Sequence, residues 1–69
     1  MSAETVLKIE GMTCSGCVRS VTRVLLSLPG VEAVDVSLER GAANVRYDEA
    51  RVGREDFRRA IDEAGFTLS

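Results

Sequence analysis

Apolar residues in the first half of this chain recur first at every second position and then at helical spacing. Residues 4–10 alternate, with Thr5, Leu7 and Ile9 on one side of an extended chain, which indicates a half-buried strand. From about residue 17 to residue 28 the apolar residues return every three or four positions, as in an amphipathic helix. This change of period limits the fold more than any other feature, because the helix must cover the apolar face of the strand.

The second half of the chain shows the same two periods. Two alternating runs, 31–38 and 43–47, indicate a hairpin around Gly41, where a positive φ costs glycine little. Residues 54–64 indicate a second amphipathic helix, and residues 66–69 a short last strand. The hairpin residues expected to face inward are Val34, Val36, Leu38, Ala43, Val45 and Tyr47.

The order strand, helix, strand, strand, helix, strand predicts an α+β fold. It is the βαββαβ order of a ferredoxin-like sandwich, a four-stranded antiparallel sheet with both helices on one face. Sixty-nine residues are enough for one domain, so we expect residues 1–69 to form a single domain. The uncovered face of the sheet is expected to carry Val6, Lys8, Glu10, Asp35, Ser37, Asn44 and Arg46.

Start and stop signals flank both expected helices. Thr13 or Ser15 is suited to cap the start of the first helix, and Pro29–Gly30 is suited to end it. Gly65 suits the position just past the second helix. The expected inward-facing helix residues are Val18, Val21, Val24, Leu25 and Leu28 in the first helix and Phe57, Ala60, Ile61 and Ala64 in the second.

Composition excludes several classes of function. The net charge is −2, with nine basic and eleven acidic residues interleaved, which gives no support to nucleic-acid binding. No apolar run approaches the roughly 18–20 residues that span a bilayer, so we expect no direct membrane insertion. No signal-peptide pattern follows the first residues. We therefore expect a cytoplasmic protein, either a complete small protein or a domain cut from a larger one.

The chain has little with which to catalyse a reaction. It contains no histidine, no catalytic triad and no glycine-rich phosphate loop of the usual spacing. The adjacent carboxylates Asp48–Glu49 and Asp62–Glu63 fall on expected turn or helix surfaces and do not converge. We expect that the chain is not an enzyme.

Both cysteines of the chain lie in one glycine-flanked stretch, "GMTCSGC", between the first strand and the first helix. A disulfide between Cys14 and Cys17 would close too short a loop to stabilise the fold much, and it would rarely persist in a reducing cytosol. The N-terminus of a helix favours thiolate over thiol, because its N–H groups are unpaired and its dipole is positive there. We therefore expect the two cysteines to have a chemical role as thiolates rather than to stabilise the fold through a disulfide.

Three interpretations of the cysteine pair are open. A soft-metal site is the first: two sulfurs fall short of the four ligands of structural zinc, whereas thiolates suit Cu(I), which two or three soft donors satisfy. The second is a redox dithiol, because C-x-x-C beside a βαβ pattern is also typical of thioredoxins. The third is a pair of buried cysteines that act as small apolar residues. The polar and glycine neighbours argue against burial. The chain is short for a thioredoxin, with no tryptophan before the pair and no proline within it, so the sequence favours the first interpretation.

The stretch from Gly11 to Cys17 resembles the G-M-T-C-x-x-C motif of the heavy-metal-associated domain family. This family contains small copper chaperones and the N-terminal metal-binding domains of copper-transporting P-type ATPases. The similarity extends along nearly the whole chain, through "LPGV" (28–31), the hairpin "VDVSLERGAANVRYD" (34–48) and "AIDEAGF" (60–66).

The resemblance implies roles for several residues. Cys14 and Cys17 match the metal ligands of the family, and Met12 matches a residue that packs beneath the metal loop. Phe66 matches a position near the loop, where it would shield the metal or simply pack in the core. Relatives selective for divalent metals often carry aspartate at the position of Thr13. The threonine here therefore favours Cu(I). Ser15 and Gly16 leave no imidazole between the cysteines.

The resemblance also implies a function and partners. It implies a metallochaperone that carries Cu(I) and transfers it by thiolate exchange to the metal-binding domain of a copper-transporting P-type ATPase. An excised domain of such an ATPase is the alternative within the family, and a dithiol redox protein is the alternative outside it. Arg19 and Arg23 are expected on the solvent-exposed face of the first helix, where they would steer an acidic partner toward the site. Two exposed dithiolates could also share copper in a bridged homodimer.

Overall fold

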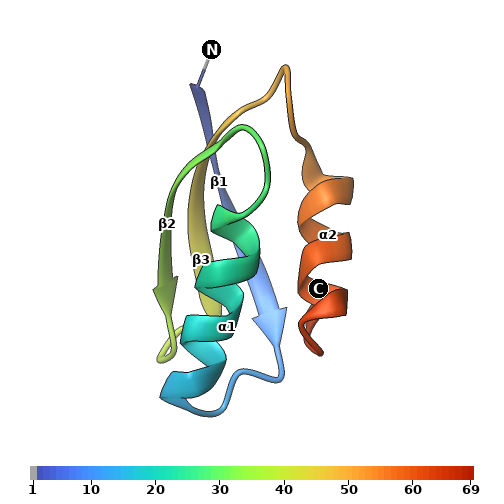
Figure 1. The fold of residues 1–69 in the computed structure, drawn as a ribbon. Coiled ribbons are helices and arrows are strands. Elements are labelled where there is room, and N and C mark those ends of the chain that lie inside the picture. Colours follow the sequence, from blue (N-terminus) through green and yellow to red (C-terminus); the bar gives the residue numbers. More distant parts are fainter. Residues whose placement is uncertain (1) are drawn as a thin grey trace.

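Six elements follow one another in the predicted order in the computed structural model, which describes residues 2–69. The elements are β1 (Ser2–Glu10), α1 (Ser15–Leu26), β2 (Val31–Ser37), β3 (Ala42–Asp48), α2 (Arg54–Glu63) and β4 (Thr67–Leu68). Both helices lie on the same side of the sheet (Figure 1). The α+β ferredoxin-like fold is therefore confirmed. Neither helix is long and apolar enough to cross a membrane.

The four strands form one antiparallel sheet in the order β2-β3-β1-β4. The central pair runs from Ser2 opposite Asp48 to Lys8 opposite Ala42. The pairing between β1 and β4 is short and joins Ile9 to Leu68 and Glu10 to Thr67. Because β1 is held on both sides near its end, the loop that follows it leaves the sheet from a well-supported strand.

The core lies between the sheet and the two helices. The largest side chains with almost no exposed surface are Phe57, Leu7, Leu25, Ile61, Val21 and Val45. Each such side chain stabilises the fold by roughly 1.5–3 kcal/mol through its removal from water. The ring of Tyr47 meets that of Phe57 edge to face, with the ring centroids 5.0 Å apart. The inward positions expected from the hairpin and helix patterns are thus largely confirmed.

One expectation about the core is wrong and one is met only in part, and the buried residues Ala42, Val52 and Leu68 were not among those expected inside. Leu38 was expected to face inward, but β2 ends at Ser37 and Leu38 is 40% exposed in the turn that follows. Ala64 lies at the C-cap of α2, only half-buried. Val52 is buried although it stands in a loop, where no periodic pattern could reveal it.

Several element boundaries differ from the prediction. β1 begins at Ser2 rather than at residue 4, because its first residues pair with the end of β3. The first helix spans Ser15–Leu26 rather than about residues 17–28. It ends before Pro29, and the chain turns at Gly30 with a φ of +96°. The second helix, Arg54–Glu63, ends one residue before the predicted end.

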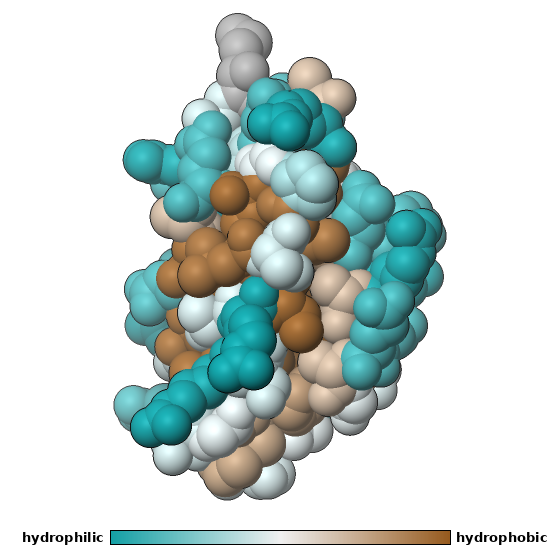
Figure 2. Space-filling model, viewed as in Figure 1, coloured by the Kyte–Doolittle hydropathy of each residue, from teal (hydrophilic) through white to brown (hydrophobic). Residues whose placement is uncertain are grey.

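The helical side of the molecule is partly apolar. Figure 2 shows apolar surface over the C-terminal half of α1, beside α2. Leu26 contributes to the exposed apolar surface of α1, with 49% of its surface accessible. Val24 and Leu28 are half-buried against the core and line a shallow hollow between the two helices. This region lies at the opposite end of α1 from the cysteine-containing loop.

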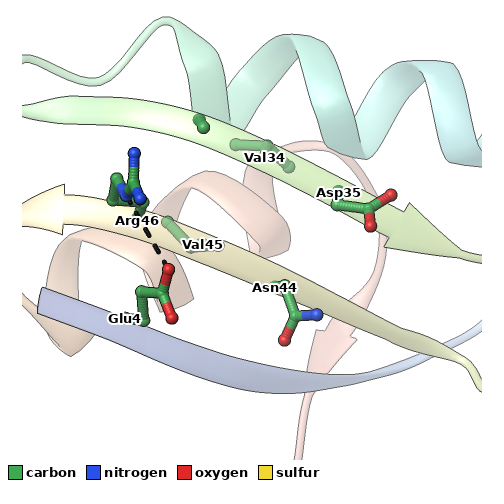
Figure 3. A pocket seen from close by; sticks show the side chains of 7 residues that line it. Glu4, Val34, Asp35, Asn44, Val45 and Arg46 are labelled. Atoms are coloured by element: carbon green, nitrogen blue, oxygen red, sulfur yellow. Dashed lines mark ion pairs between the residues drawn. The ribbon is translucent and has the colours of Figure 1, made fainter.

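The other face of the sheet is uncovered, as the alternation predicts. Val6 is 58% exposed on it, and Lys8, Asn44 and Arg46 are exposed beside it. Ser37, also expected there, is half-buried. Figure 3 views this face with both helices behind the sheet.

Candidate metal site

The loop between β1 and α1 is shaped by a glycine and a buried methionine. Gly11 has a φ of +99°, a conformation that other residues rarely adopt, so the chain turns sharply where β1 ends. Met12 is only 9% exposed and belongs to the main core cluster. The structure thus places Met12 beneath the loop, as the family resemblance implies. With Met12 anchored, the next residues are held at the surface.

Cys14 occupies the N-cap of α1. Its backbone is extended, with a φ of −151° and a ψ of 165°, and its Sγ accepts a hydrogen bond from the Cys17 backbone N–H at 3.3 Å. The prediction that Thr13 or Ser15 caps this helix is therefore wrong. Hydroxyl side chains are the better intrinsic caps, but here the helix begins at Ser15 and the capping bond goes to the Cys14 sulfur.

The two sulfur atoms lie side by side at the start of α1. Cys17 is the third residue of the helix, and its Sγ is 2.8 Å from the Sγ of Cys14. A disulfide bond would be about 2.05 Å long, and both cysteines are free. Cys14 is exposed, whereas Cys17 is half-buried and packs against the core. The interpretation of two buried cysteines acting as apolar residues is therefore wrong for Cys14.

The surroundings of Cys17 favour its thiolate form. A hydrogen bond from the Cys14 side chain is the largest cause that lowers the pKa of the Cys17 thiol, and the backbone at Thr13 adds to the effect. Partial desolvation opposes this change. The first turn of α1 also contains no acidic residue, so no carboxylate there repels a sulfur anion. One of the two sulfurs is thus prepared to bind a cation.

No further conventional ligand approaches the two sulfurs. Within residues 2–69, the structure brings together no group of three or more His, Cys, Asp or Glu side chains that could hold a metal ion. Ser15 and Gly16, between the cysteines, are exposed. A Cβ added at Gly16 would lie 3.8 Å from the Cys14 Sγ, an ordinary contact. The arrangement offers two soft donors on an open surface.

Phe66 reaches the loop from the far end of the chain. A Cβ added at Gly11 would lie 3.4 Å from its Cδ1 atom, so the ring is beside the first residue of the loop. The same ring is half-buried against the core cluster. Both expected roles, a shield near the metal and ordinary core packing, are compatible with this position.

Two arginines project from the helix that begins at the site. Arg19 and Arg23 are exposed, one turn apart, and they are the charged residues of α1.

Sequence reasoning located the cysteines but missed the capping role of Cys14. The signal was present, because the three-residue spacing from Cys14 to Cys17 is the spacing between an N-cap and the N–H group that it accepts from.

Comparison with known proteins relates this chain to heavy-metal-associated domains. The sequence model of the family described as "Heavy-metal-associated domain" matches residues 6–67. The copper chaperone CopZ of Staphylococcus aureus (strain JH9) is 34% identical over 66 residues, which cover 96% of this chain and 97% of that protein. Copper-transporting ATPase 2 of Homo sapiens is 40% identical over 65 residues, which cover 94% of this chain. The chain spans only 4% of that ATPase's length.

A solved structure agrees with the sequence comparison. The structure of a CopZ metallochaperone superimposes with a TM-score of 0.94 and 33% sequence identity. The superposition covers 97% of this chain and all of the other.

Proposed function

The chain belongs to the heavy-metal-associated domain family, and from this premise we propose that it binds one Cu(I) ion between Cys14 and Cys17 and delivers it to another protein. The observation that carries the proposal is the pair of free sulfurs, 2.8 Å apart, at an exposed helix N-terminus. In this proposal residues 1–69 act as one domain that carries its cargo and catalyses no reaction.

The chemistry of the donors supports copper in its monovalent state. Thiolates are soft ligands that select Cu(I), zinc and iron–sulfur clusters. Structural zinc takes four ligands, and Cys14 and Cys17 provide two. Thr13 places a hydroxyl, rather than a carboxylate that would suit a divalent ion, just before Cys14. Cu(I) is the ion that two sulfurs can satisfy.

Binding requires a small movement of the loop. Metal–sulfur bonds are about 2.3 Å long in thiolate sites, so an ion held between two sulfurs at a wide angle needs them farther apart than 2.8 Å. Cys17 belongs to α1 and packs against the core, whereas Cys14 is exposed at the helix cap. We expect Cys14 to swing outward when copper binds.

The same asymmetry suggests how copper leaves. A thiolate of a partner protein approaches from the exposed side and forms a bond to Cu(I), which gives a three-coordinate ion shared by the two proteins. The bond to Cys14 then breaks, and a second partner thiolate replaces Cys17. No electron is transferred and copper stays monovalent throughout. An open site with few ligands favours this exchange, because a closed four-ligand cage would retain the ion.

The partner that fits best is a metal-binding domain of a copper-transporting P-type ATPase. The similarity to both a CopZ chaperone and copper-transporting ATPase 2 supports this partner. The exposed Arg19 and Arg23 beside the site favour an acidic docking surface. We place the activity in the cytoplasm, because a reducing compartment keeps both thiols free.

Two other functions and one assembly would use the same two sulfurs. The match to part of a copper-transporting ATPase supports a domain of such a transporter, which would receive copper through the same two sulfurs. Two chains, each with an exposed dithiolate, can also share copper and form a bridged homodimer. A redox dithiol uses the same sulfur pair, and the assays below separate it from a carrier.

A competition titration tests the proposal. Reduced protein is mixed with Cu(I) and a chromogenic Cu(I) chelator, and we expect one ion bound per chain. The Cys14→Ser and Cys17→Ser variants should lose the ion to the chelator, whereas Ser20→Ala, a change elsewhere on the exposed surface of α1, should not. Transfer is followed by mixing the loaded chain with an ATPase metal-binding domain. Efficient insulin reduction without tight copper binding would refute the carrier and support the redox protein.

A further inference from the structure

The uncovered sheet face carries charges of both signs around an exposed valine. The strand register places its residues in three rows that cross β1, β3 and β2 in turn. The rows are Glu4, Arg46 and Ala33; then Val6, Asn44 and Asp35; then Lys8, Ala42 and Ser37. Figure 3 shows that Glu4 and Arg46 point toward each other, and their charged atoms are 3.7 Å apart.

Short side chains leave this face hollowed. One hollow of about 260 Å³ lies around Ala33, Asp35 and Asn44, and a second adjoins it between Val6 and Ala42. Val6 is 58% exposed in the middle row although it is a large apolar residue. A face with an exposed apolar centre and a charged surround has the layout of a protein interface.

We propose that this face binds the same face of a second copy of the chain. The two sheets would stack with their strands nearly parallel, about 10 Å apart, as in aligned sheet packing. The two-fold axis would run along the strands, between β1 and β3. Each β1 then lies over β3 of the second copy, and the metal loops of both copies remain at the same end of the dimer.

The charge pattern is complementary to itself under this symmetry. Glu4 of one copy lies over Arg46 of the second copy, and the reverse pair forms on the other side of the axis. The existing pair of Glu4 and Arg46 thereby becomes a square of four alternating charges. Asp35 lies diagonally across from Lys8 of the second copy. An axis perpendicular to the strands would instead bring Asp35 against Asp35, which is unfavourable.

The apolar centre fits the same arrangement. The two Val6 side chains lie in the same row, one on each side of the axis. Across the strands they are separated by one strand spacing, about 4.8 Å. Each also covers the hollow beside Asn44 of the other copy. Burial of this valine from both copies supplies an apolar contact inside the ring of charges.

The charge balance of the face argues against a nucleic acid as the occupant. The strand register also places Asp48 on this face, so four acidic residues, Glu4, Glu10, Asp35 and Asp48, stand against three basic ones, Lys8, Arg40 and Arg46. Nucleic-acid surfaces require an excess of positive charge, and single strands stack on exposed aromatic rings. The aromatic residues of this chain, Tyr47, Phe57 and Phe66, belong instead to the core or pack against it. A partner with the same mixture of acidic and basic residues fits better.

The size of the face sets the strength of the dimer. The two longest dimensions of the molecule are 33 and 20 Å, so the face is smaller than the roughly 800 Å² per partner of a standard interface. We expect a weak dimer, with a Kd between about 10 μM and 1 mM. It forms without copper, because neither cysteine lies on this face.

Sedimentation equilibrium of the reduced, metal-free chain tests the proposal. Between about 10 μM and 2 mM, the apparent mass should rise from the monomer toward the dimer, also in a Cys14→Ser/Cys17→Ser variant. Glu4→Arg alone and Arg46→Glu alone each place like charges in the square and should weaken the dimer by about tenfold or more. The double variant Glu4→Arg/Arg46→Glu restores alternation and should return the Kd to within about threefold of the original. Val6→Asp should weaken the dimer, and Arg58→Glu, on α2, should leave it unchanged.

Several results would overturn the proposal. One is a chain that stays monomeric across the whole concentration range. A second is a dimer that requires copper or the cysteines, which would place the contact at the metal loop. A third is a dimer that the single charge reversals leave unchanged, or that the double reversal does not restore. Circular dichroism serves as the folding control for every variant, and one-to-one Cu(I) binding serves for the variants that keep both cysteines. Glu4, Val6, Arg46 and Arg58 are exposed, so their replacement should not disturb the core.

Discussion

Both helices of this molecule begin just after a loop that follows a strand, but their first turns are completed by different chemistry. At the start of α2, the Asp56 carboxylate accepts a hydrogen bond from the Gly53 backbone N–H at 2.9 Å, and Glu55 adds a second acidic residue. At the start of α1, the Cys14 sulfur accepts the capping bond from Cys17, and no acidic residue is present in the first turn.

The difference separates a helix start that stabilises the fold from one that can bind a ligand. Carboxylates near a helix N-terminus are favourable by typically 0.3 to about 1 kcal/mol each, because they complement the helix dipole and its free N–H groups. A thiol is a weaker acceptor than a carboxylate, but it gains strength as an anion and binds soft metals. The N-terminus of α1 therefore retains favourable electrostatics that a cysteine thiolate can use.

Replacing a cysteine should have the largest effect. Cys14→Ser and Cys17→Ser each remove one of two ligands, so we expect the affinity for Cu(I) to fall by more than about 100-fold, beyond the usual cost of losing an outer-shell partner. The measurement is the chelator competition described above. A variant that retained wild-type affinity would show that the sulfurs are not the ligands.

Replacing Cys14 by serine should not lower the stability of the fold. Serine is among the best N-cap residues, so Cys14→Ser should leave the free energy of unfolding of the metal-free chain unchanged or slightly higher. Urea unfolding measures this. A large loss of stability would mean that Cys14 supports the fold and would weaken the contrast between the two helix starts.

Removing the capping carboxylate of α2 should lower the stability of the fold but leave copper affinity unchanged. Asp56→Ala deletes the acceptor for the Gly53 N–H, and we expect the free energy of unfolding to fall by about 1 kcal/mol. Copper affinity should remain unchanged, because Asp56 lies on the other helix. If copper binding weakened as much as after a cysteine replacement, the two helix starts would not be functionally distinct.

Giving α1 an acidic first turn should make it resemble α2. Ser15→Asp should raise the free energy of unfolding by about 0.3–1 kcal/mol. The new negative charge should also raise the pKa of the Cys17 thiol, because it disfavours a neighbouring anion. The pH dependence of Cys17 alkylation measures the second effect. Ser20→Asp, beyond the first turn, is the control and should change the Cys17 profile less, since the dipole effect is local.

The smallest expected effect is a pH dependence of stability. The pKa of Cys17 is lowered in the folded chain, so its anion stabilises the fold above the ordinary cysteine pKa. This contribution is lost as the pH falls through the lowered value. The unfolding free energy of the metal-free protein should therefore rise across that pH window, and Cys17→Ser should remove the rise. An identical rise in the variant would assign it to another group.

Periodicity and glycine placement were enough to predict most of the fold. Alternation identified β1, and its inward residues Leu7 and Ile9 are buried. The positive φ expected at Gly41 is present, because a hairpin turn of this kind requires a residue that tolerates it. These features are local, so a sequence pattern can carry them. The position of the cysteine pair at the start of α1 was predictable for the same reason.

The features that the sequence did not reveal depend on contacts between distant segments. Val52 is buried by its neighbours in space, although its own segment has no period. Phe66 reaches the loop at Gly11 only because the chain folds back at its end. No local pattern encodes such contacts.

X-ray absorption spectroscopy of the copper-loaded chain tests the central claim most directly. The account predicts Cu(I) coordinated by two sulfur atoms of one chain at one ion per monomer, with no nitrogen or oxygen ligand. Loss of this sulfur signal in Cys17→Ser should accompany the loss of binding. Divalent copper, or a coordination shell dominated by nitrogen and oxygen, would contradict the claim that two thiolates at the start of α1 hold the ion.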